Sequence, residues 1–144
     1  MEEYRKEKEA IENNIEATKN YQKAQEKRYD RQIELLQAEG KETRKIEKLK
    51  VSLNVETQKQ ILQDRIKGLK EAQKTNNKIT KLFAKVQLGA QIERLKEAQF
   101  EELKFDKETN KIKLDNYREY QKNRLDIARQ IEPDRDWETF YLRT

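Results

Sequence analysis

This chain of 144 residues is poor in apolar side chains: 33% of its residues are hydrophobic and 42% are charged, with a formal net charge of +5. A compact globule of this length would lack material for its core, and the absence of cysteine and histidine excludes disulfides and removes the two best ligands of transition metals. Three glycines and one proline leave few helix breakers. We therefore expect an all-α protein of long helices, arranged as an extended helical hairpin or coiled coil, with a short helical turn after Pro133.

The first predicted helix covers residues 2–39. Its apolar residues recur at a period of 3.5 to 3.6, but polar side chains occupy the same stripe at Thr18, Gln22 and Gln25. This pattern predicts a weak seam between helices, with polar residues that set the register. Gly40 suits the left-handed position just beyond a helix C-terminus, and we expect a turn there.

The second predicted helix covers about 42–74. Val51, Leu53 and Val55 alternate as in a strand, but a lone strand has no partner elsewhere in the sequence, so a helix is favoured. The Thr75-Asn76-Asn77 triplet is the candidate break before the next helix, because these residues form helices poorly and Asn tolerates turns.

The third predicted helix covers about 78–131 and has the strongest apolar pattern. Its apolar residues are expected to supply most of the buried face: Ile79, Leu82, Phe83, Val86, Leu88, Ile92, Leu95, Phe100, Leu103, Phe105, Ile112, Leu114, Tyr117, Leu125, Ala128 and Ile131. Gly68 and Gly89 are interpreted as positions of close helix packing, and Pro133 as the stop. The chain then divides into an elongated helical region, 1–131, and an aromatic tail, 132–144.

Six lysines recur at spacings of three and four near the centre of the chain: Lys67, Lys70, Lys74, Lys78, Lys81 and Lys85. On one unbroken helix they would form a stripe about 27 Å long that could follow the phosphates of a nucleic acid. The alternative is a solvated helix flank, and we favour it because no interleaved aromatic residues accompany the lysines.

The tail carries three large rings at helical spacing, Trp137, Phe140 and Tyr141, followed by Leu142. Trp and Tyr are typical of binding hot spots, so this turn is a candidate anchor for a protein partner. The alternative is that it packs against the end of its own helical bundle.

No catalytic, cofactor or metal site is expected, because the usual general base is missing and no phosphate-binding or calcium loop is present. The start of the chain has no apolar core typical of a signal peptide, and no apolar run approaches the roughly 20 residues that span a bilayer. We therefore expect a soluble, intracellular (cytoplasmic) protein, or one within a virus-like particle, without a membrane partner.

The leading hypothesis is a non-enzymatic structural or assembly protein that meets protein partners, or itself, through helical seams. The alternatives are a basic accessory protein that binds nucleic acid through residues 67–85, and a helical adaptor or chaperone-like regulator. In composition the helices, rich in Lys, Glu, Gln and Asn, resemble helical components of phage particles such as segments of tape-measure proteins. That resemblance implies a virion component, but no motif carries it and no residue role follows from it.

Overall fold

Three helices account for the part of the chain that a computed structural model describes, residues 2–131. Helix α1 covers Glu2–Ala38, α2 covers Arg44–Gln73 and α3 covers Lys78–Ile131, and no strand occurs among these residues. The predicted all-α class and the three predicted segments are thus confirmed. The turn expected after Pro133 lies outside the described residues. The described residues divide into two units between Phe105 and Asp106, which are described separately below.

The turn between α1 and α2 depends on Gly40, whose φ of 68° lies in the left-handed region. The amide of Lys41 donates to the carbonyl of Leu36 at 2.8 Å, and the amide of Gly40 donates to the carbonyl of Gln37 at 3.1 Å. These two bonds form a Schellman motif, which satisfies the last carbonyls of α1. The predicted turn at Gly40 is confirmed.

The second turn interrupts the helix between Gln73 and Lys78, as the Thr75-Asn76-Asn77 triplet predicts. Thr75 bonds back through its hydroxyl to the carbonyl of Ala72 at 2.7 Å. Asn77 caps α3, since its side-chain oxygen accepts from the amides of Ile79 and Thr80 at 3.0 and 3.2 Å. The Asn oxygen thus supplies an acceptor to backbone amides that otherwise have no partner at the start of a helix.

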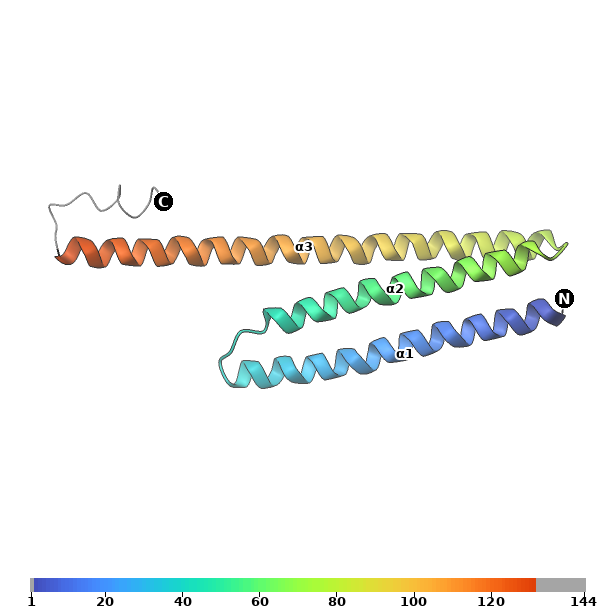
Figure 1. The fold of residues 1–144 in the computed structure, drawn as a ribbon, viewed down its shortest axis with the longest axis horizontal. Helices are drawn as coiled ribbons and strands as arrows, with labels where there is room; N and C mark the ends of the chain where they lie inside the picture. The colour runs from blue at the N-terminus through green and yellow to red at the C-terminus, as the bar shows by residue number, and fades with distance from the viewer. Residues whose placement is uncertain (1, 132–144) are drawn as a thin grey trace. The chain divides into compact units, whose positions relative to one another are not determined.

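Helices α1 and α2 form a closely packed antiparallel hairpin (Figure 1). Ile11, Ile15 and Ile61 make its buried apolar cluster. Gly68 faces Ile11 of α1, and a Cβ added at this glycine would lie 4.0 Å from the Ile11 Cδ1, an ordinary van der Waals contact. Gly68 therefore lies at the helix interface, but the space there would also admit an alanine. The residues that alternate like a strand lie in α2, where Val55 is buried.

The first part of α3 lies beside α2 along a stripe with spacings of four and three, which we call the inner seam. Three of its members are buried and the rest are half-buried: Ala84, Leu88, Gln91, Leu95, Ala98, Glu102 and Phe105. Contacts of polar side chains join the two helices. The hydroxyl of Ser52 donates to Glu102 at 2.9 Å, and the Arg44 guanidinium lies 3.9 Å from the centre of the Phe105 ring.

The prediction that large apolar residues fill the buried face of α3 is wrong at most of its positions. Exposed members are Ile79, Leu82, Phe83, Val86, Ile92, Phe100, Leu103, Ile112, Leu114 and Tyr117. In the first unit the fully buried positions of α3 are instead small or polar, namely Ala84, Gln91 and Ala98. A Cβ at Gly89 would meet nothing within 4 Å, so the expectation of close packing there is also wrong within this single chain.

Residues 106–131 continue α3 in the second unit. Every side chain from 111 to 120 is exposed, and Gln121 donates to the Tyr117 hydroxyl at 2.8 Å. Leu125 and Ala128 are buried, as predicted. Among the described residues, no helix is long and apolar enough to cross a membrane.

Candidate assembly surface

A second heptad stripe runs along α3 within the first unit, and we call it the outer seam. Each member from Leu82 onward precedes an inner-seam residue by two positions, and Ile79 extends the stripe by one step. Its members are Ile79, Leu82, Val86, Gly89, Glu93, Lys96, Phe100 and Leu103. All eight positions are exposed.

The two seams lie on opposite sides of the helix. A step of two residues turns an α-helix by about 200°, which is close to half a turn. The exposure of the side chains agrees with this placement. The inner seam is covered while Ile79 is 79% exposed and Leu82 and Phe100 are each 63% exposed. Each seam repeats every seven residues, the period of helices that pack side by side over their length. Helix α3 therefore carries one occupied packing face and one free packing face in this unit.

Charge interrupts the outer seam at its centre. Glu93 and Lys96 form an ion pair of 3.5 Å there, with both side chains exposed. Large apolar residues lie on either side: Ile79, Leu82 and Val86 before it, Phe100 and Leu103 after it. Gly89 leaves a notch between the first group and the charged pair. The seam thus has an internal order of apolar, small, acidic, basic and apolar positions.

A chain of side-chain hydrogen bonds crosses the unit and fixes α3 on the hairpin. From α1, Gln22 donates to Glu26 and to Asn54 of α2, each at 3.0 Å. Gln58 donates to the same Asn54 oxygen at 3.2 Å. Gln91 of α3 then donates to the backbone carbonyl and side-chain oxygen of Gln58 at 3.0 and 2.8 Å. The sequence prediction of a register-setting polar residue at Gln22 fits this chain of bonds.

Gln91 is a residue that sequence reasoning missed. Its side chain is fully buried and its Oε1 has no hydrogen-bond partner. A polar residue at a heptad seam position is the signal that could have found it, because such residues specify register at a cost in stability. The same reasoning had already identified Gln22 and Gln25 in the first helix.

Asp64 on α2 is the buried carboxyl of the hairpin. Its Oδ2 lacks a hydrogen-bond partner, and burial raises the pKa of the carboxyl above its usual value. The positive charges of Lys67 and Arg65 oppose this rise. The nearby Arg65 guanidinium is itself engaged by both oxygens of Glu12 on α1. Ionised Asp64 is therefore a destabilising element in the hairpin.

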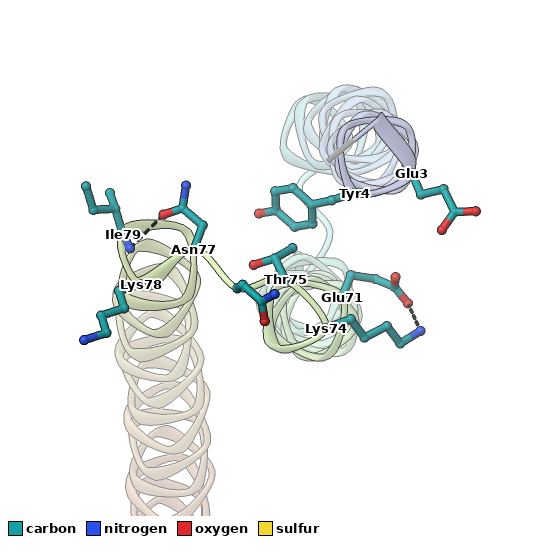
Figure 2. A pocket seen from close by; sticks show the side chains of 9 residues that line it. Glu3, Tyr4, Glu71, Lys74, Thr75, Asn77, Lys78 and Ile79 are labelled. Atoms are coloured by element: carbon teal, nitrogen blue, oxygen red, sulfur yellow. Dashed lines mark hydrogen bonds and ion pairs between the residues drawn. The ribbon is translucent and has the colours of Figure 1, made fainter.

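An open hollow of about 790 Å³ lies between the start of α1 and the α2–α3 turn (Figure 2). Tyr4 extends from α1 over this turn, and burial, followed by the charge of Glu12, raises the pKa of its phenol. Lys74 donates to Glu71 at 2.9 Å, which is the first cause of its raised pKa. Tyr4 thus stays neutral and Lys74 stays charged around neutral pH, so neither supplies a base.

The six lysines do not form one stripe. Lys67 and Lys70 lie on α2, Lys74 follows its end, and Lys78, Lys81 and Lys85 lie on α3 beyond the turn. The unbroken helix that the 27 Å stripe requires is therefore contradicted, and Lys74 is paired with Glu71. Polyanion binding by these lysines stays a prediction without that geometric support.

The predicted anchor of Trp137, Phe140, Tyr141 and Leu142 lies outside the described residues. Within residues 2–131, no group of three or more carboxylates is placed to hold a metal ion. Comparison with protein-family models, with curated proteins and with solved structures gave no match.

Proposed function

We propose that this chain is a structural or assembly protein that packs into a larger protein complex or particle through the free face of α3. The single observation that supports this proposal is the outer seam: five large apolar side chains lie exposed at heptad positions along one side of a helix. Burying one such side chain contributes about 1.5–3 kcal/mol. Exposed apolar patches bordered by polar residues, such as the two groups on either side of Glu93 and Lys96, typically mark sites of protein interaction.

The rest of the first unit is suited to hold that face in place. The hairpin of α1 and α2 covers the inner seam, and the buried amide of Gln91 ties α3 to Gln58. A rigid support keeps the entropy cost of association low, because the helix need not be ordered on binding. In this proposal the hairpin is the scaffold and α3 is the docking element.

The experiment is site-specific photo-crosslinking with the full chain in its native assembly. A crosslinking amino acid replaces Val86 on the outer seam, and the matched control replaces Gln60, an exposed residue of α2. We expect discrete protein adducts from position 86 and few from position 60. The crosslinked species is identified, purified and required to bind the unmodified chain again. Equal labelling at both positions, or failure to rebind, would refute the proposal.

A further inference from the structure

We infer that the outer seam of α3 pairs with the outer seam of a second copy of this chain, in antiparallel orientation. The inference rests on the proposed function and names the partner of the same surface. In a symmetric dimer of this kind, both copies use the same surface patch, so every contact occurs twice. Among the antiparallel registers of the outer seam, one also brings opposite charges together.

The charged pair sets the register. With the two-fold axis between Glu93 and Lys96, Glu93 of each copy faces Lys96 of the other. The same register places Gly89 opposite Phe100 and Val86 opposite Leu103. Opposite charges thus meet, a large ring meets a notch, and two branched apolar side chains meet each other. The notch is open in the single chain, since nothing lies within 4 Å of a Cβ at Gly89.

Other arrangements leave Glu93 and Lys96 without opposite charges. Parallel in-register pairing would set Glu93 against Glu93 and Lys96 against Lys96, which repel. Sliding the antiparallel pair by one heptad in one direction pairs Leu82 with Phe100 and Ile79 with Leu103. It also places Glu93 opposite Gly89 and Lys96 opposite Val86, so neither charge meets its opposite. Sliding it in the other direction places the two charges opposite Leu103 and Phe100. Charged groups facing apolar surface lose hydration without gaining a partner. Among these registers, only the first sets both charged residues against opposite charges, and it matches positions 86–103 of the outer seam.

The steric requirement is also met within the first unit. The contacting positions, 86–103, span about 27 Å of helix. They lie on the side of α3 opposite the inner seam, so α2 does not cover them. Because the sequence has no cysteine, labels can be placed singly to measure the pairing.

Charge reversal tests the inference. Sedimentation equilibrium of the full chain should show a monomer–dimer equilibrium over a range of concentrations. Glu93→Lys and Lys96→Glu should each raise the dissociation constant at least about tenfold, because like charges then meet twice. An equimolar mixture of these two variants should restore dimers, since each supplies the charges that the other lacks. Both positions are exposed in the monomer, so neither variant should alter its helical circular dichroism.

A second variant tests the notch. Gly89→Gln should stabilise the monomer by improving helix propensity while abolishing the dimer, because its side chain occupies the space of Phe100 from the second copy. Gln60→Ala is the control that should change neither the dimer nor its concentration dependence. Stability and association thus move in opposite directions, which separates this effect from misfolding.

Orientation is measured with single spin labels at Arg94→Cys and Glu101→Cys, which occupy equivalent heptad positions. In the antiparallel dimer the two labels at 94 lie near the axis, whereas those at 101 are offset by about 20 Å along the helices. Equal distances at both sites would indicate parallel pairing and overturn the inference. A monomer at every concentration would also overturn it, but a crosslinked heterologous partner at position 86 would leave the proposed function standing.

Discussion

Replacing Gln91 is the sharpest test of how α3 is attached to the hairpin. Gln91→Ala removes two hydrogen bonds to Gln58, each worth about 0.5–1.5 kcal/mol, and leaves a cavity at a fully buried position. Removal of the buried Oε1 that has no partner offsets much of the hydrogen-bond loss, and better helix propensity returns a few tenths of a kcal/mol, so the cavity is the main cost. We expect a net loss of about 2–4 kcal/mol in the free energy of unfolding.

Gln91→Leu separates polarity from packing. Leucine keeps most of the volume and loses the same two hydrogen bonds, but it also removes the buried Oε1 that has no partner. An unsatisfied buried group costs about 1–3 kcal/mol, so the two effects nearly offset. We expect this variant to lie within about 1 kcal/mol of the wild type.

The assay is urea unfolding followed by far-ultraviolet circular dichroism at one fixed protein concentration. Gln60→Ala, at an exposed position of α2, is the matched control and should be neutral or slightly stabilising. If Gln91→Ala behaved like this control, Gln91 could not be buried between α2 and α3, and the described packing of the first unit would be wrong.

Three further predictions concern the turns and the buried carboxyl. Gly40→Ala forces a Cβ into the left-handed region and should lower the free energy of unfolding by about 1–2 kcal/mol in the same urea assay. Asn77→Ala removes the cap of α3 and should cost about 1 kcal/mol, with Asn77→Ser retaining most of the stability; an equal loss in both would argue against capping. Asp64→Asn should stabilise the protein at neutral pH by on the order of 1 kcal/mol. Since the folded pKa of Asp64 is raised, the wild type gains stability relative to this variant as pH falls through that pKa toward the ordinary value of 3.8, and a pH-independent difference would contradict the assignment.

The helices and turns of this protein depend on interactions between residues close together in the sequence, so they can be predicted from the sequence. Gly40 and Asn77 act through their own backbone conformation or through the two or three residues beside them, so their roles can be inferred without knowing the tertiary structure. The polar-interrupted stripe of α1 is equally readable, and Gln22 makes the contact with α2 that such a residue predicts.

The choice of the covered face of α3 could not be inferred in the same way. Two seams share one helix and one period, and the usual preference for burying large residues favours the outer one. The partner of Gln91 is Gln58, 33 residues away, so only the packed structure reveals why a glutamine occupies a buried position. The lysine stripe was conditional on an unbroken helix, and the turn that separates Lys70 from Lys78 is the one that the Thr75-Asn76-Asn77 triplet predicts.

The two seams also constrain how the length of α3 can change. Inserting or deleting one residue between 84 and 103 would rotate every later side chain by about 100°, which would misalign both faces at once. A change of seven residues would preserve both faces, since seven residues make nearly two whole turns. Any relative that keeps the two surfaces is therefore expected to differ in this stretch by whole heptads, and substitutions on one face can accumulate independently of the other.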